Sequence, residues 1–125
     1  MKKSLIKALL FLPVFVLLLN SAAVAETYVV VKNGVAKRYD TKTGAYKGTV
    51  GNSGATAASS DGESIAVLMQ TGSVHRYDSN GAYRGRVGSG KAVGVQVAGG
   101  VIVVTYENGS LRRYDAKTGA YKGSN

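Results

Sequence analysis

An internal repeat constrains the fold of this chain more than any other feature of its sequence. Residues 38–51 read RYDTKTGAYKGTVG, and related strings return at residues 76–88 (RYDSNGAYRGRVG) and 113–125 (RYDAKTGAYKGSN). The three Tyr-Asp pairs lie 38 and then 37 residues apart, a period typical of proteins built from repeated supersecondary units. The sequence therefore predicts three units, over about residues 26–51, 52–88 and 89–125.

The first 25 residues have the order of a secretory signal peptide: three lysines, an apolar run, and Ala23-Val24-Ala25 as an A-x-A cleavage site. The apolar run, residues 8–19, has 12 residues and is shorter than the roughly 20 that a spanning helix needs. We expect cleavage after Ala25, export to a periplasm or the outside, and no stable membrane span thereafter. An uncleaved membrane anchor is the alternative, whereas a lipoprotein anchor is excluded because no cysteine follows the run.

The remaining 100 residues are basic and have the composition of a β-sheet protein. Three of the 16 Lys and Arg residues precede residue 26, which leaves 13 against seven acidic residues and a net charge of +6. All 17 glycines and all eight tyrosines lie in this part, which contains no Phe, Trp or Cys. Tyrosine favours strands and glycine favours turns, so the composition predicts an all-β domain without disulfides.

Turn signals divide this domain into eleven expected strands. Asn33-Gly34 is the strongest signal for a two-residue hairpin turn, and Asp40 and Gly44 are expected to open and close a longer turn. The strands are expected at residues 27–32, 35–40, 45–50, 55–59, 65–69, 74–78, 82–87, 92–98, 101–104, 111–115 and 120–123. Each unit is then a four-stranded antiparallel meander, except that the first unit lacks its first strand.

The second strand of each unit is apolar on both faces, at residues 28–31, 65–69 and 101–104. A meander strand that is buried on both faces requires another sheet on either side. Four-stranded meanders of about 40 residues that stack radially are the blades of a β-propeller. We therefore predict an all-β fold of three propeller-like blades.

Two segments carry a resemblance to known propeller repeats. Residues 60–78, with Asp61-Gly62 between two strands and Tyr77-Asp78 ending the third, resemble a blade of the WD-repeat family. Residues 114–119, YDAKTG, are similar to the Asp-x-x-Thr-Gly turn of pyrroloquinoline-quinone-type propeller repeats. Tyrosine replaces the WD tryptophan, and the Gly-His before the first strand is absent. The resemblance implies the architecture and no particular activity, because propellers host many unrelated functions.

Three blades are fewer than the about four to eight that close a propeller. An open stack would expose an apolar blade face and a sheet edge. We expect self-association, with a homodimer that completes six blades in a ring. A fragment of a longer propeller and a marginally stable monomer are the alternatives.

The arginines before the repeated tyrosines are the first candidate ligand-binding residues. Their guanidinium groups would offer forked donors to phosphate, sulfate or carboxylate. The alternative, which we favour, is that each stem packs between blades while the head pairs with an Asp or a carbonyl group. These residues are Arg38, Arg76 and Arg113.

Basic and aromatic residues also recur in the fourth strand of each unit. The basic ones, named here the basic belt, would attract acidic polymers, or would block edge-to-edge strand pairing, which we favour. The tyrosines would stack on sugars or bases, or would be half-buried packing residues. The belt comprises Lys47, Arg84 and Lys122, and the tyrosines are Tyr46, Tyr83 and Tyr121.

No pattern in the sequence indicates catalysis. His75 is the only histidine and there is no cysteine, so a His-based triad or metal cluster is not expected. We expect no enzyme activity and no cofactor. The expected function is that of an exported binding or scaffold module, which mediates protein–protein interaction or self-assembly in the cell envelope. The alternative is a lectin-like or polyanion-binding protein that uses the repeated Arg, Lys and Tyr positions.

Overall fold

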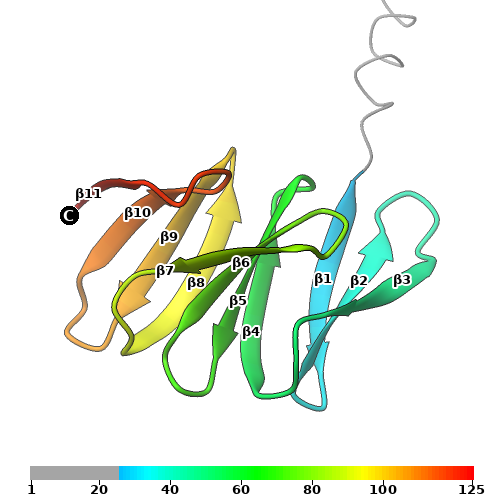
Figure 1. The fold of residues 1–125 in the computed structure, drawn as a ribbon, viewed down its shortest axis with the longest axis horizontal. Coiled ribbons are helices and arrows are strands. Elements are labelled where there is room, and N and C mark those ends of the chain that lie inside the picture. The colour runs from blue at the N-terminus through cyan, green and yellow to red at the C-terminus, as the bar shows by residue number, and fades with distance from the viewer. Residues whose placement is uncertain (1–25) are drawn as a thin grey trace, which may run out of the picture.

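Eleven strands form three antiparallel sheets that stand side by side in chain order in the computed structural model, which describes residues 26–125 (Figure 1). The expected signal peptide, residues 1–25, lies outside the described residues. We name the sheets blades 1, 2 and 3. Blade 1 holds β1 (Thr27–Lys32), β2 (Val35–Asp40) and β3 (Tyr46–Val50), blade 2 holds β4 (Ala55–Ser60), β5 (Ser64–Met69), β6 (Val74–Asp78) and β7 (Tyr83–Val87), and blade 3 holds β8 (Ala92–Ala98), β9 (Val101–Tyr106), β10 (Leu111–Asp115) and β11 (Tyr121–Ser124).

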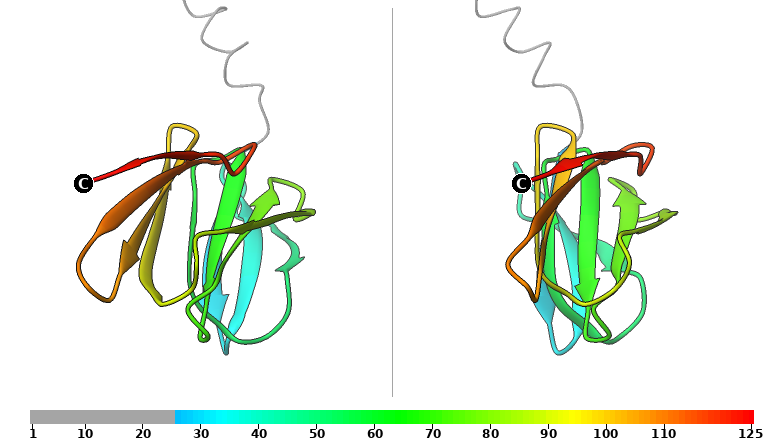
Figure 2. Two further views of the ribbon diagram at one scale, coloured as in Figure 1. Left: turned by 60° about the vertical axis from the view of Figure 1, so that its left-hand side comes forward. Right: turned by 90° about the vertical axis from the view of Figure 1, so that its left-hand side faces the viewer.

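Each blade is a simple meander in which strands that follow one another along the chain also pair. Within residues 26–125, the all-β class, the eleven strands and the three-stranded blade 1 are confirmed, with strand ends shifted by at most two residues. The blades face one another in chain order, since β4 packs on β1 and β2, and β8 packs on β4 and β5. Figure 2 shows this stack from two further directions. The described residues form no helix, so none is long and apolar enough to cross a membrane.

The hairpin turns follow the local chemistry of the sequence. Asn33 and Gly34 have φ angles of 53° and 76° between the paired residues Lys32 and Val35, as a two-residue turn of this type requires. In the longer turn of blade 1, Oδ2 of Asp40 accepts bonds of 2.7 Å and 2.9 Å from the backbone N–H and hydroxyl of Thr43. The turn of blade 3 repeats this pattern at Asp115 with the same two lengths.

The core lies between the blades in two layers. Between blades 1 and 2, the largest fully buried side chains are Val50, Ile65 and Val67. Between blades 2 and 3, a second layer gathers Val74 with Ile102 and Val104. Blade 2 therefore contributes to both layers and is the centre of the structure.

The expectation that every second strand is buried on both faces is correct for blade 2 only. The strand β5 is buried from Ser64 to Leu68. In contrast, β9 alternates between half-buried and buried residues, and Tyr28 in β1 is 42% exposed. The reason is that blades 1 and 3 each have only one neighbour within the described residues.

Candidate functional site

Each repeated arginine donates a hydrogen bond to the extra residue of a β-bulge in its own blade. In blade 1 the pairing of β2 with β3 shifts register between Arg38 and Tyr39, and Lys47 is the extra residue on β3. The bulge removes the Lys47 carbonyl from the strand ladder, and Nη2 of Arg38 donates to this carbonyl at 2.8 Å. The same bond joins Arg76 to the carbonyl of Arg84 in blade 2.

The same guanidinium groups also join neighbouring blades. Nη1 of Arg38 donates to the carbonyl of Ser79 in the turn of blade 2, at 3.1 Å. Nη1 of Arg76 donates to the carbonyls of Ala116 and Lys117 in the turn of blade 3, at 3.1 Å and 3.0 Å. The two arginines thus connect blade 1 to the turn of blade 2 and blade 2 to the turn of blade 3. This agrees with the interpretation that each arginine packs between blades and pairs with carbonyl groups.

A glycine in each receiving turn makes room for the arginine. A Cβ atom on Gly81 would lie 3.1 Å from Nε of Arg38, and one on Gly119 would lie 2.9 Å from Nε of Arg76. Both glycines have positive φ angles, 88° and 81°, which disfavour other residues in any case. The arginine therefore supplies the hydrogen-bond donors of this contact, and the turn supplies the carbonyl acceptors and the space at its glycine. We call it the arginine–turn contact.

Arg113 differs from its two counterparts. Its Nη2 donates to the carbonyl of Lys122, the bulge residue of blade 3, at 3.3 Å, and its side chain is exposed. In contrast, Arg76 is only 8% exposed. The three arginines are thus equivalent within their blades, but they are not brought together into one anion-binding cluster. Arg38 lies between blades 1 and 2, Arg76 lies between blades 2 and 3, and Arg113 lies on the outer face of blade 3.

The two ends of the stack expose sheet faces whose counterparts inside it are buried. At one end, Tyr28 and Tyr39 stack with ring centroids 5.4 Å apart; the residues of blade 3 at these positions, Ile102 and Tyr114, are 0% and 6% exposed. We name this the blade 1 end face, with Tyr28, Val30 and Tyr39.

At the other end, Leu111 is half-buried, although Val74, its counterpart in blade 2, is 1% exposed. We name this the blade 3 end face, with Val103, Leu111 and Arg113.

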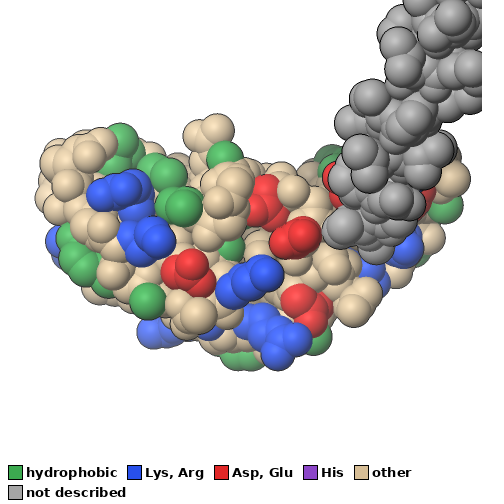
Figure 3. Space-filling model, turned by 90° about the horizontal axis from the view of Figure 1, so that it is seen from above, with side chains coloured by type: hydrophobic (Ala, Val, Ile, Leu, Met, Phe, Trp, Pro, Cys, Tyr) green, Lys and Arg blue, Asp and Glu red, His purple; other side chains and the backbone are tan. Residues whose placement is uncertain are grey.

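The basic belt lies on the exposed edge strands of the three sheets. All three side chains are exposed, and they stand on three separate blades. Arg84 forms an ion pair of 2.8 Å with Asp78 in its own blade. Figure 3 shows, on the side of the stack seen there, basic side chains interleaved with acidic ones rather than gathered in one patch.

The repeated tyrosines on the last strand of each blade are more exposed than the half-buried position expected for packing residues. Tyr46, Tyr83 and Tyr121 are 56%, 57% and 58% exposed. The ring of each lies 5.6 Å from that of a tyrosine on the preceding strand of its blade: Tyr39, Tyr77 and Tyr114 respectively. One edge of each ring is therefore fixed by packing while most of its surface faces solvent.

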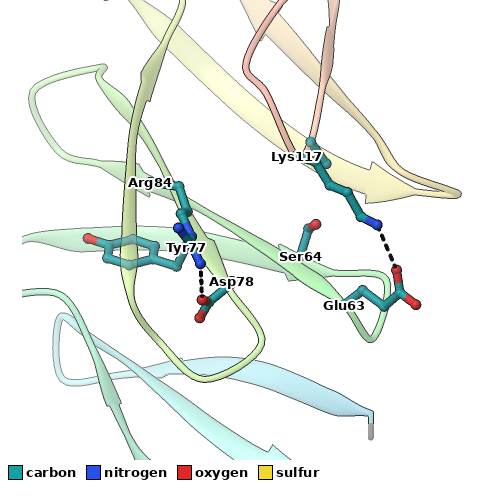
Figure 4. A pocket seen from close by; sticks show the side chains of 7 residues that line it. Glu63, Ser64, Tyr77, Asp78, Arg84 and Lys117 are labelled. Carbon is teal, nitrogen blue, oxygen red and sulfur yellow. Dashed lines mark hydrogen bonds and ion pairs between the residues drawn. The ribbon is translucent and has the colours of Figure 1, made fainter. Parts of the chain in front are cut away.

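A cavity of about 270 Å³ opens between blades 2 and 3 beside the arginine–turn contact (Figure 4). Its charged lining groups are paired: Arg84 with Asp78 at 2.8 Å, and Lys117 with Glu63 at 3.9 Å. The lining carries equal numbers of positive and negative side chains. It therefore offers little net charge to attract an ionic ligand.

Asp61 is a connection between blades that the sequence did not reveal, because the Asp61-Gly62 pair by itself indicates only a turn. Its Oδ2 accepts a 2.7 Å bond from the N–H of Gly100 in blade 3, while Oδ1 accepts bonds from Glu63 and Ser64. Burial alone would raise the pKa of Asp61, but these backbone N–H donors outweigh it and lower the pKa below its ordinary value.

The described residues, 26–125, contain no cluster of side chains that could hold a metal ion. No three His, Cys, Asp or Glu side chains in this range lie close enough to hold a metal ion. The ring of His75 packs edge-on against Tyr83. Burial, and then the charge of Arg86, lower the pKa of His75, so it is neutral near pH 7.

The fold has counterparts among solved structures. The crystal structure of BamB from Moraxella catarrhalis matches 80% of this chain with a TM-score of 0.60 and 19% sequence identity. The computationally designed protein Ika8 matches 81% with a TM-score of 0.57 and 16% identity. The chain spans only 33% and 36% of those two chains.

At these identities the similarity establishes propeller-like blade repeats and nothing about activity. No protein-family model matches the chain, and no curated protein matches it in sequence. The likeness to WD repeats therefore remains a resemblance in turn chemistry.

Proposed function

We propose that this protein is an exported, non-catalytic interaction module that binds protein surfaces in the cell envelope. The observation that carries the proposal is the pair of end faces, each of which exposes apolar residues at positions that are buried inside the stack. Exposed apolar surface of this kind marks sites of protein–protein contact. The signal-like order of residues 1–25 supports export.

The short loops support a binding role. Within blades 1 to 3 the strands are joined by turns of two to five residues, which leave no insertion for an active site. The binding surface is then supplied by the sheets themselves, at the two ends of the stack.

Site-specific photo-crosslinking in the native cells tests this function. A crosslinking side chain at Tyr28 or at Leu111 should form adducts with protein, because both positions lie on end faces. The same side chain at Thr49, which is exposed on the edge strand β3, is the matched control and should form none. Absence of protein adducts at both end faces would overturn the proposal.

Polyanion binding by the basic belt is the second candidate, favoured by the exposed basic and tyrosine side chains on the last strand of every blade. Binding of inorganic polyphosphate should weaken steeply as salt rises, because counterions are released from the polymer. Replacing Lys47, Arg84 and Lys122 together by Ser should abolish it while the far-UV circular dichroism stays unchanged. Affinity that is flat with salt, or retained by the triple variant, would refute this role.

A further inference from the structure

The blade 3 end face carries half of an arginine–turn contact. Arg38 and Arg76 each donate to the bulge carbonyl of their own blade and also to the turn of the next blade. Arg113 makes the first of these bonds, to Lys122, and no bond to another blade within the described residues. The donor side of a third contact is therefore present and exposed at one end of the stack.

The blade 1 end face carries the other half. Its turn, residues 40–44, reads DTKTG, and differs at one position from the DAKTG that Arg76 contacts in blade 3. The two hydrogen bonds from Thr43 to Asp40 have the same lengths as those from Thr118 to Asp115. Gly44 has a φ angle of 76° against 81° for Gly119. At Gly44, however, no atom of the described residues, apart from Gly44 itself and its two neighbours in the chain, lies within 4 Å of the position that a Cβ would take. This turn thus has the geometry that receives an arginine, without an arginine in it.

The apolar residues around these two halves correspond in the same way. Val103 and Leu111 on the blade 3 end face occupy the positions of Ala66 and Val74, which are 0% and 1% exposed at the boundary of blades 2 and 3. On the blade 1 end face, Tyr39 occupies the position of Tyr114, which is 6% exposed. The two end faces are therefore the two sides of a boundary that the chain already forms twice.

We propose that a second copy of this chain docks head to tail, with the blade 3 end face of one copy on the blade 1 end face of the other. Arg113 then donates to the partner's carbonyl at Thr41, the position that corresponds to Ser79 and Ala116, and packs on the partner's Gly44. This inference rests on the proposed function, and it identifies a second copy of the chain as the protein that the end faces bind.

Two copies that dock in this way at both ends would form a closed ring. A head-to-tail interface forms a ring when the rotation between copies closes. Two copies joined at both ends contain six blades, within the range of about four to eight that closes a propeller. Each junction also buries the apolar residues that an open stack leaves in water.

The mass in solution tests the contact. Protein expressed from the full-length sequence and purified from the exported fraction should have the mass of two chains by light scattering on a sizing column. Arg113→Glu should reduce the mass twofold, because it puts a carboxylate against backbone carbonyls. Arg112→Glu is the matched control. The Arg112 side chain lies over the Tyr106 ring within blade 3, so this variant should keep the two-chain mass.

A second variant tests the receiving side. Gly44→Asn should also give single chains, because asparagine tolerates the positive φ while its side chain fills the space that Arg113 would enter. Mixing the two single-chain variants should restore a two-chain species, since the pair retains one intact junction, from Arg113 of the Gly44→Asn variant to the unchanged turn of the Arg113→Glu variant. A mixture that stayed at the mass of single chains would contradict the pairing of Arg113 with this turn.

The outcomes separate this inference from the function on which it rests. A wild-type mass of one chain at every concentration, or a two-chain mass unaffected by Arg113→Glu, would overturn head-to-tail docking. If the end-face crosslinks then joined a different protein, the proposed function as an interaction module would be supported, and only the proposal of a second copy as the partner would be wrong. Crosslinks between two copies at Leu111, lost in Gly44→Asn, would support both.

Discussion

Nε of Arg76 lies 2.9 Å from the position that a Cβ atom on Gly119 would take, although the two residues are 43 positions apart in the chain. The glycine is thus required for two independent reasons, its φ angle of 81° and the arginine of the preceding blade. Gly44 shares the first requirement and lacks the second within one chain. This pair of glycines makes the contribution of the arginine–turn contact measurable.

Gly119→Ala should destabilise the chain more than Gly44→Ala does. Both substitutions place an alanine at positive φ, at a cost of about 1–2 kcal/mol, but only the first displaces Arg76, which adds about 1–3 kcal/mol. Urea unfolding in an Arg113→Ala background, where contacts within one chain dominate, measures the difference. Equal losses for the two variants would mean that Arg76 moves aside without cost.

Arg76→Met should lower the free energy of unfolding by about 2–4 kcal/mol, because it leaves the carbonyls of Ala116, Lys117 and Arg84 without their donor. Arg84→Met is the control, since the Arg84 side chain is 57% exposed and such an ion pair contributes only about 0–1 kcal/mol. Urea midpoints at one protein concentration compare the two. A similar loss in both would contradict the role of Arg76 as a connection between blades.

The acid limb of stability should depend on Asp61. Burial would raise the pKa of Asp61, but hydrogen bonds from backbone N–H groups, including those of Ser64, Glu63 and Gly100, hold it below its ordinary 3.8. A lowered pKa contributes stability that is present above pH 3.8 and is lost as the pH falls through the folded-state value. Asp61→Asn should cost about 1–3 kcal/mol at pH 7 and should make the decline below pH 3.8 shallower.

Urea unfolding at a series of pH values measures this limb. Part of the decline should remain in the variant, because the pKa values of Asp40, Asp78 and Asp115 are also lowered, mainly by backbone hydrogen bonds in their turns. An unchanged acid limb would show that Asp61 bonds Gly100 equally well when protonated.

The alkaline limb should depend on Tyr106. Burial, and then the 3.2 Å hydrogen bond with the Tyr114 hydroxyl, raise the pKa of Tyr106 to about 12. Stability is therefore fully present below pH 10 and is lost as the pH rises toward 12, because the unfolded chain releases this proton first. Tyr106→Phe should cost about 1 kcal/mol at pH 7 and reduce the loss above pH 10. A thermal melt series at pH 8–12 measures both effects.

The architecture could be predicted because its determinants are local. Asn33-Gly34 fixes its hairpin by backbone preference alone, and Asp40 opens its turn through its own side chain, with Thr43 three residues on as a partner. Such signals lie within a few residues of each other, so they can be read from one string. Their recurrence at a fixed period then reveals the blades.

The contacts between blades could be predicted only in part. The interpretation that arginine stems pack between blades agrees with the structure for Arg38 and Arg76, which each bond to a turn of the next blade. The bulge at Lys47 depends on the register of two strands, and the bond from Gly100 to Asp61 depends on how two blades stack, so neither leaves a pattern in the sequence. Periodicity also cannot tell whether the sheet that covers an apolar strand belongs to the same chain, which is why the sequence predicts burial of β1 and β9 on both faces.

The arginine–turn contact has a consequence for how a gene of this kind changes in length. Every blade carries the donor on one side and the receiving turn on the other, so each boundary is formed by the same pair of parts. Gain or loss of one whole repeat, as recombination between similar DNA segments produces, alters the number of boundaries without creating a mismatched one. The number of blades per chain is therefore free to vary while the rules of assembly stay the same.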